Sequence, residues 1–484
     1  MARLSYDGPL DRYLGFNDQA ALTVIPPNFE KRLLEVTRTA YVLIAAGTLA
    51  ALLMAILVGS GVIDRLSNDG NVDRAVALQA LVLYWLLGVL VVLAMTFRDR
   101  YWKHYLLAVG AAVFACGVLE GGLRLLSPAL SLPKFRHLRS AHQHHVAEAN
   151  RDFHLGYFEG EHVFVHTNED GLRSHYDRAG FKSLGTRIAC LGDSFTFGAW
   201  VQDDETFSMQ LEKRLRKKLG HEDVGVLNAG VLSYSPLLQE KMLDRVVQYY
   251  DPQVVLLMLD CTDIGDDYDY GLEYDPGRTY PGPFEGPELS RPYPYYGALW
   301  RLLNPYHDAI LAPMRLLGRL GASYQPFDPH AYNKFHLEIN GTVETERFFI
   351  YRHPLEVTRP YFDASWENIR RIEEKCREID AQFVLVVSPR FHHWNTKECP
   401  QNWEAFAYSL DEPHQDVIFH YFDEQARTSS FPVYTMLKDF QATSEFPLVF
   451  ETDPHWNPQG HRFVADRLLE LLNRETPGVV GEGP

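Results

Sequence analysis

In the sequence CLGDSFTFGAW, residues 190–200, an apolar run changes into a turn that contains glycine, aspartate and serine. The preceding residues, TRIACL (186–191), end in the continuous apolar run that is typical of a strand covered on both faces. Gly192 and Gly198 permit a tight turn and a close approach of another molecule. The pattern predicts a buried strand that leads into a helix, with Ser194 between them.

Four further apolar runs follow along the chain, and amphipathic patterns separate them. The runs are VGVLN (224–228), QVVLLML (253–259), FVLVVS (383–388) and FPVYTML (431–437). Strands that alternate with helices predict an α/β domain over residues 181–475, with a flavodoxin-like, doubly wound parallel sheet. Ligands of such sheets bind beyond the carboxyl ends of the strands, where Ser194 is expected to lie.

Three helices can be placed from their apolar faces and caps. Phe207, Leu211 and Leu215 recur every four residues, and Gly220 is expected to end that helix. A second apolar face comprises Trp366, Ile369, Ile372, Cys376 and Ile379. Before the last helix, Asn457 is expected to be the N-cap and Pro458 the first helical residue.

Two stretches do not follow this alternation. Residues 127–180 are expected to form a connector into the domain, and residues 264–362 form an insertion rich in aromatic residues, proline and glycine. Nine aromatic residues lie between Tyr268 and Trp300. At that density the insertion could be a lid, a platform on which sugar rings stack, or a structural loop.

The first 126 residues predict an all-α transmembrane region. Residues 39–63 and 75–97 are 25 and 23 residues without a charge, and each is long enough to span a hydrocarbon core of about 30 Å. Residues 105–126 are expected to span as well, although Glu120 and Arg124 leave a re-entrant or interfacial helix as the alternative.

The distribution of basic residues predicts which side of the membrane each part occupies. Basic residues precede the first span within the tail 1–38, and RDRYWKH (98–104) lies between the second and third spans. The positive-inside rule therefore predicts a cytoplasmic N-terminus and, after three crossings, a periplasmic domain on a multi-pass protein of the plasma (inner) membrane. Lys134, Arg136 and Arg139 count against this orientation.

Composition excludes several function classes. A formal net charge of −17 argues against nucleic acid as a partner, because phosphate binding needs clustered basic residues. We expect no cofactor, because no phosphate-binding glycine loop or dinucleotide fingerprint occurs. We also expect no metal: DIGDDYD (263–269) lacks the glycine and final glutamate of a calcium loop, and HQHH (142–145) is more typical of a polar surface segment.

The segment ETDPHWNPQGH (451–461) supplies the partners that a nucleophilic serine needs. Asp453 and His455 lie in the loop between the last strand and the last helix, beyond the same sheet edge as Ser194. A serine is a weak nucleophile until a base takes its proton, and the base needs an orienting group. A lone loop histidine is usually a surface or capping residue, but this pairing predicts Ser194 as nucleophile, His455 as base and Asp453 as its partner.

The domain resembles the SGNH/GDSL hydrolase family over roughly residues 165–475. The resemblance is carried by TNEDGLR (167–173), GDSFTFG (192–198), LNAGVLSYS (227–235), LDCTD (259–263) and DPHWNPQGH (453–461). It implies the same roles for Ser194, His455 and Asp453. TNEDGLR is similar to the lead-in of membrane-anchored members, and the Asp-x-His spacing resembles the branch involved in O-acetylation of exopolysaccharides.

The chain departs from the family at two oxyanion-hole positions. The resemblance implies an oxyanion hole made of Ser194, Ser233 and Thr262, where the family commonly has glycine at the second position and asparagine at the third. A backbone amide at 233 or at Gly230 could still donate, but the Thr262 hydroxyl reaches less far than an asparagine amide. Loss of one such donor typically costs about 10²–10³ in rate.

These features give a leading function and two alternatives. The leading function is a membrane-anchored serine esterase that removes ester-linked acyl groups from a cell-envelope glycan or lipid. The same triad could serve an O-acyltransferase that acetylates an exopolysaccharide together with a polysaccharide-modifying membrane partner. The changes at Ser233 and Thr262 leave a third reading, a catalytically weak glycan-binding or scaffold protein.

Overall fold

The computed structural model describes residues 137–140, 142–273, 337–481 and 114–126, with scattered positions between 42 and 53, between 85 and 89, at 111 and between 129 and 135. The chain divides into two compact units, Met1–Gly61 with Ala77–Ala115, and Val62–Val76 with Cys116–Pro484. The predicted tail 1–38 and most of the spans 39–63 and 75–97 lie outside the described residues, as do residues 105–110, 112 and 113 of the third predicted span. Within the described part, no helix has both the length and the apolar character that crossing a membrane requires.

The second unit contains a five-stranded sheet in which every pairing is parallel. Its strands are β5 (Thr186–Gly192), β6 (Val224–Gly230), β7 (Val254–Leu259), β10 (Gln382–Val387) and β11 (Val433–Thr435). Their order is β11-β10-β7-β5-β6, so the chain winds outward in both directions from β5 and β7. The predicted α/β class and parallel sheet are confirmed. β11 is shorter than the predicted run 431–437 at both ends, and helix α14 (Leu437–Ala442) begins at the last residue of that run.

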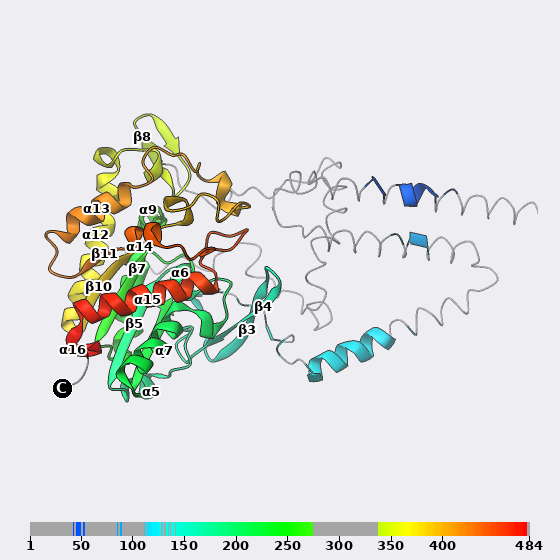
Figure 1. The fold of residues 1–484 in the computed structure, drawn as a ribbon, viewed down its shortest axis with the longest axis horizontal. Coiled ribbons are helices and arrows are strands. Elements are labelled where there is room, and N and C mark those ends of the chain that lie inside the picture. The colour runs from blue at the N-terminus through cyan, green and yellow to red at the C-terminus, as the bar shows by residue number, and fades with distance from the viewer. Residues whose placement is uncertain are drawn as a thin grey trace, which may run out of the picture. The chain divides into compact units, whose positions relative to one another are not determined.

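Helices cover both faces of the sheet (Figure 1). One face packs against α7 (Phe207–Leu219) and α15 (Pro458–Glu475), which contact each other. The other face packs against α8 (Pro236–Arg245), α12 (Leu355–Glu378) and α13 (Val417–Ala426). Successive residues of a strand point to opposite faces, so a strand needs a continuous apolar run to fill both layers.

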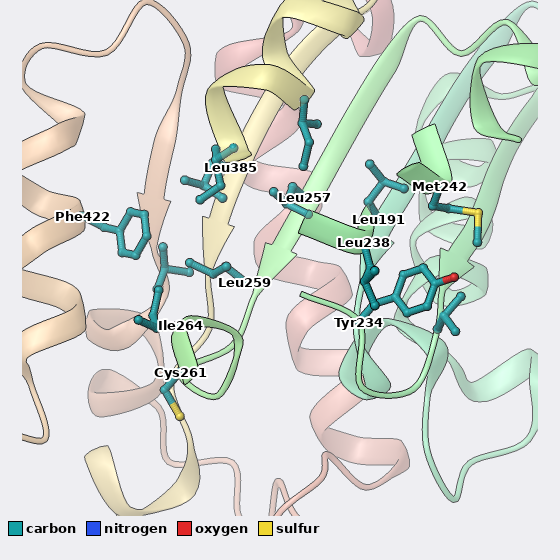
Figure 2. Close-up of a cluster of buried hydrophobic side chains, with 14 of the residues drawn as sticks. Leu191, Tyr234, Leu238, Met242, Leu257, Leu259, Cys261, Ile264, Leu385 and Phe422 are labelled. Atoms are coloured by element: carbon teal, nitrogen blue, oxygen red, sulfur yellow. The ribbon is translucent and has the colours of Figure 1, made fainter. Parts of the chain in front are cut away.

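Figure 2 shows part of the layer that α8 and α13 cover. Leu191, Leu257 and Leu385 come from three neighbouring strands, and all are fully or almost fully buried. Leu238 and Met242 reach them from α8, while Phe422 reaches them from α13. Each such buried side chain contributes about 1.5–3 kcal/mol, so this layer fixes the strand ends that carry the site.

The predicted helix caps are present. α7 ends at Gly220, which takes the left-handed conformation with φ 74°. The Asn457 side chain accepts hydrogen bonds from the Gln459 and Gly460 amides, and Pro458 begins α15. α12 buries Ile369, Ile372 and Cys376, as its apolar pattern predicts.

Most of the predicted connector, residues 127–180, is folded onto the domain. It forms the hairpin of β1 (His137–Ser140) and β2 (His144–Ala147), the hairpin of β3 (Arg151–Phe158) and β4 (Glu161–Thr167), and the start of α5 (Arg178–Lys182). Phe153 and Val165 pack against Phe197. His144 and His145 of the HQHH segment are buried, unlike the exposed residues expected there. In the described stretches, no group of three metal-ligating side chains is placed to hold an ion.

The described ends of the insertion, residues 264–362, are folded as well. α9 (Asp263–Glu273) follows β7 and contacts α8 and α12. A hairpin of β8 (Leu337–Ile339) and β9 (Thr342–Glu344) precedes α12. The aromatic segment between Tyr274 and Trp300 lies outside the described residues.

Candidate active site

Ser194 is the first residue of the short helix α6 (Ser194–Phe197), directly beyond the carboxyl end of β5. Asp193 caps this helix, because its side chain accepts a hydrogen bond from the Phe195 amide (2.9 Å). A Cβ atom at Gly192 would lie 2.1 Å from Thr196 Oγ1, so only glycine fits the turn. Gly192 therefore allows the tight turn that connects β5 to α6.

The three predicted catalytic side chains lie together. His455 Nε2 is 2.7 Å from Ser194 Oγ. His455 Nδ1 forms a short hydrogen bond with Asp453 Oδ1, which also accepts from the His455 amide at 2.9 Å. Ser194 is half-buried, while His455 and Asp453 side chains keep 13% and 7% of their surface exposed. The hydroxyl, imidazole and carboxylate thus form one continuous chain of hydrogen bonds.

The loop that carries His455 is held at both ends. An isolated antiparallel bridge pairs Val449 with Trp456, and the Phe450 amide donates to the His455 carbonyl oxygen (3.2 Å). On the other side, the Phe195 ring packs 4.8 Å from the His455 ring. The imidazole therefore has a fixed position relative to α6, although the two segments are far apart in the sequence.

The charges around this chain favour an ionised aspartate. Burial alone would raise the pKa of Asp453, but the neighbouring His455 and the hydrogen bonds that the carboxylate accepts outweigh burial and lower it. Burial alone would lower the pKa of His455, but the negative charge and hydrogen bond of Asp453 raise it above its usual value. Asp453 thus stabilises the imidazolium that forms when His455 takes a proton.

The residues expected to form the oxyanion hole are not equivalent. The Ser194 amide has no hydrogen-bond acceptor within the described part of the chain, so it is available to a ligand. Both Thr262 donors are directed at Asp260 Oδ2, with the hydroxyl at 2.7 Å and the amide at 3.2 Å. This is a difference from the expectation for Thr262. The Thr262 side chain is buried beside the Asp260 carboxylate, and an ionised acceptor forms stronger hydrogen bonds than a neutral one.

Of the two other amides considered as donors, that of Gly230 already has an acceptor within the chain. Ser233 is exposed after β6, with φ 62°, and its carbonyl oxygen accepts from the Tyr270 hydroxyl (2.8 Å). The Gly230 amide donates to Asn228 Oδ1 (3.0 Å). Gly230 instead allows close packing, because a Cβ atom there would lie 2.2 Å from the Phe197 nitrogen.

A buried group of charges lies beneath the serine turn. Asp260, after β7, receives three hydrogen bonds from Arg390, which also pairs with Glu404. Burial, and then the charge of Asp260, raises the pKa of Asp193 to about 6. The Arg390 guanidinium lies 5.5 Å from the centre of the Phe195 ring, on which His455 also packs.

Several residues that support the site were missed by sequence reasoning. Trp200 and Trp403 donate from their indole nitrogens to Asp453 Oδ2, at 3.2 and 2.9 Å. Asn228 donates to the Thr196 carbonyl oxygen (2.9 Å) and so ties β6 to α6. Arg173, within TNEDGLR, is buried and binds the carbonyl oxygens of the loop after α6. Of the segments that hold these residues, TNEDGLR (167–173) and LNAGVLSYS (227–235) carry a signal, because both contribute to the resemblance to the SGNH/GDSL family.

A cavity of about 630 Å³ lies on the Trp200 side of Asp453. Phe158, Trp200 and Phe450 form its aromatic wall, and Glu159, Glu161, Glu205 and Glu451 line it with carboxylates. Phe158 stacks on Trp200 at 4.6 Å, and Glu159 accepts from the Thr452 amide at 2.9 Å. Residues of the β3–β4 hairpin therefore form part of the rim beside the site.

No family model and no curated protein matches this chain. Its structure is similar to that of a two-domain esterase (CEX) active on acetylated mannans, with 12% identity and a TM-score of 0.31, over 63% of this chain and 53% of the other. Acetyl xylan esterase AlAXEase is 14% identical with a TM-score of 0.31, over 59% of this chain and 99% of the other. A GDSL-like lipase from Bacteroides thetaiotaomicron is 8% identical with a TM-score of 0.29, over 60% of this chain and 89% of the other. The chain spans about half the length of the first esterase. These likenesses concern the α/β fold alone.

Proposed function

We propose that this protein is a serine esterase whose nucleophile is Ser194, with His455 as general base and Asp453 as its orienting partner. The observation that carries the proposal is the 2.7 Å contact between Ser194 Oγ and His455 Nε2, with the other imidazole nitrogen bonded to Asp453. A half-buried serine held this way at a strand-to-helix turn has the arrangement that acyl transfer requires.

The chemistry follows from these positions. His455 Nε2 takes the Ser194 proton while Oγ attacks the ester carbonyl carbon, and the Ser194 amide donates to the oxygen that becomes negative. The imidazolium then protonates the departing alcohol, which leaves the acyl group on Ser194. His455 next deprotonates a water molecule that attacks the acyl carbonyl, and the acid is released as Ser194 regains its proton.

Hydrolysis of a small ester tests the proposal. The purified full-length chain is incubated with p-nitrophenyl acetate, beside the Ser194→Ala variant. We expect turnover by the wild-type chain and a loss of at least about 10³-fold in the variant, because removal of a nucleophile leaves only binding and oxyanion effects. Equal rates for the two proteins would contradict the proposal.

We propose an ester-bearing glycan or lipid of the cell envelope as the substrate, since the uncharged stretches 39–63 and 75–97 favour a membrane anchor.

We also propose that the domain lies in the periplasm. A carboxy-terminal alkaline phosphatase fusion tests this orientation, because the reporter is active only outside the cytoplasm. Active fusions support a periplasmic domain, and inactive but stable fusions contradict it.

The acyl-enzyme could pass its acyl group to a glycan hydroxyl in place of water. The Asp-x-His spacing of residues 453–455 is the observation that favours this second function. Incubation with radiolabelled acetyl donor and an envelope polysaccharide separates the two outcomes. Label released as acetate supports the esterase, and label bound to the polysaccharide supports the transferase.

A further inference from the structure

We infer that Trp200 and Trp403 are positioning residues, which hold Asp453 against His455 through two indole N–H groups. The inference rests on the proposed function, because Asp453 is the orienting partner in it. Trp200 Nε1 lies 3.2 Å and Trp403 Nε1 lies 2.9 Å from the same carboxylate oxygen, Oδ2. Neither tryptophan belongs to the Ser194, His455 and Asp453 set.

The two indoles complete the hydrogen bonding of the carboxylate. Asp453 is 5% exposed, and its Oδ1 accepts from the amide and the imidazole of His455. Its Oδ2 accepts from both tryptophans. Rotation of the carboxylate would break bonds on both oxygens, and a buried charge without partners is costly. We call the two indole N–H groups of Trp200 and Trp403 the clamp. The clamp keeps Asp453 Oδ1 against His455 Nδ1, which leaves the lone pair of His455 Nε2 directed at Ser194.

Trp200 shows a second feature, a backbone conformation that bulky residues avoid. Its φ is 67°, in the left-handed region, which is strained for a residue with a bulky side chain. The surroundings hold it there. Arg173 binds the carbonyl oxygens of Phe197, Gly198 and Val201 (2.6–2.9 Å), and Phe158 stacks on the indole. Trp200 thus keeps a strained backbone conformation while its indole donates to Asp453.

Trp403 contacts Asp453 from a segment far from Trp200 in the sequence, the region after β10. It begins the short helix η8 (Trp403–Phe406), and its amide donates to the Thr452 carbonyl oxygen (3.2 Å). Its side chain is 45% exposed, yet its only polar atom bonds to the buried carboxylate. Hydrophobic packing alone does not explain an indole in this orientation, whereas support for Asp453 does.

The clamp should change how His455 titrates. Among the charged groups near His455, Asp453 and Glu404 raise its pKa and Arg390 lowers it, and the buried side chains of Asp193 and His461 also interact with the imidazole. When Asp453 is free to rotate, its charge lies on average farther from Nδ1. The imidazolium then loses stabilisation, and the acid limb of the rate profile moves to lower pH.

Steady-state kinetics with p-nitrophenyl acetate test the inference in the full-length chain. For Trp403→Phe and Trp200→Phe we expect about 10-fold lower kcat, an unchanged KM, and an acid limb of kcat/KM at lower pH than in the wild-type chain. The double variant should lose more than either single variant, because each single change leaves one donor on Oδ2.

Trp366→Phe is the control for the change of tryptophan to phenylalanine. Trp366 lies on α12, where its ring packs on Phe422 and Phe431, away from Asp453 and from the loop that carries His455. We expect its stability to fall while kcat and the acid limb stay as in the wild-type chain. A shift of the limb in this control would show a general packing effect and overturn the inference.

The failures of the two proposals can be told apart. If wild-type Ser194 is not modified by a fluorophosphonate, the proposed function is wrong. If Ser194 is modified and Trp403→Phe keeps the wild-type kcat and acid limb, only the clamp is wrong. The exposed Trp403 site makes this variant decisive even where Trp200→Phe does not fold.

Discussion

At the scale of single residues, the geometry of Asp453 explains how His455 can act on Ser194. Every hydrogen bond at this carboxylate is accepted, from His455 on one oxygen and from the two indoles on the other. A group that must donate at either position cannot replace it. The same arrangement fixes the imidazole tautomer, because Nδ1 donates to Asp453 and Nε2 accepts from Ser194.

Asp453→Asn should therefore lose far more activity than its similar size indicates. The amide nitrogen of asparagine donates, so it would face either the indoles or the His455 Nδ1–H and force one set apart. We expect kcat to fall by about 10³–10⁴-fold in the p-nitrophenyl acetate assay. A variant within about 10-fold of the wild-type chain would exclude Asp453 from catalysis.

The raised pKa of His455 predicts the pH dependence of activity. His455 must be neutral to take the Ser194 proton, so activity is present above its pKa and is lost as the pH falls through it. The acid limb of kcat/KM should therefore have its midpoint above 6.5, the usual value. A midpoint below 6.5 would show that Asp453 does not stabilise the imidazolium.

At the scale of elements, β6 and α6 must approach closely to place Ser194. Gly230 makes this contact possible, because a Cβ atom there would meet the Phe197 nitrogen at 2.2 Å and the Thr196 carbonyl carbon at 2.6 Å. Backbone atoms cannot move aside as the end of a flexible side chain can. The contact therefore couples the end of β6 to the helix that begins with Ser194.

Gly230→Ala is expected to displace α6 and to lower both stability and activity. Overpacking of this kind costs about 1–3 kcal/mol, which urea denaturation can measure. Gly478→Ala is the control, since a Cβ atom there has no neighbour within 4 Å. Similar stability and kcat for the two variants would contradict the close contact.

Most strands were predictable because continuous apolar runs serve both layers of the sheet. β5, β6, β7 and β10 begin and end within two residues of their predicted bounds. The hairpin of β3 and β4 was not predicted, although Val163, Phe164 and Val165 of β4 are residue types that favour a strand. The indole contacts could not be predicted, since Trp200 and Trp403 meet Asp453 only through tertiary folding.

Across the described part of the molecule, folding buries several histidines in neutral form. Burial lowers the pKa of His461 to about 3, and it lowers the pKa of His393 and His145 to about 4. His461 Nδ1 accepts a hydrogen bond from the Phe207 amide (3.1 Å), which requires an unprotonated nitrogen. The contact joins α15 to the first turn of α7.

These histidines predict a loss of stability in acid. Below pH 6.5 the unfolded chain binds protons that the native chain excludes, so stability falls as the pH falls from 6.5 toward 3. For one histidine that is protonated only in the unfolded chain, each pH unit changes the free energy of unfolding by about 1.4 kcal/mol. His461→Asn keeps an acceptor for the Phe207 amide and should lose less stability between pH 7.5 and 5.0. Equal losses in urea denaturation would exclude His461.

Modification by a fluorophosphonate tests whether Ser194 is a nucleophile that His455 activates. The folded full-length chain is treated at pH 7.5, and the site of the adduct is located by mass spectrometry beside Ser194→Ala and His455→Ala. The account predicts one adduct, on Ser194, which is absent in Ser194→Ala and forms at least about 10³-fold more slowly in His455→Ala. No adduct on Ser194 in the folded wild-type chain, or an equal rate in His455→Ala, would contradict it.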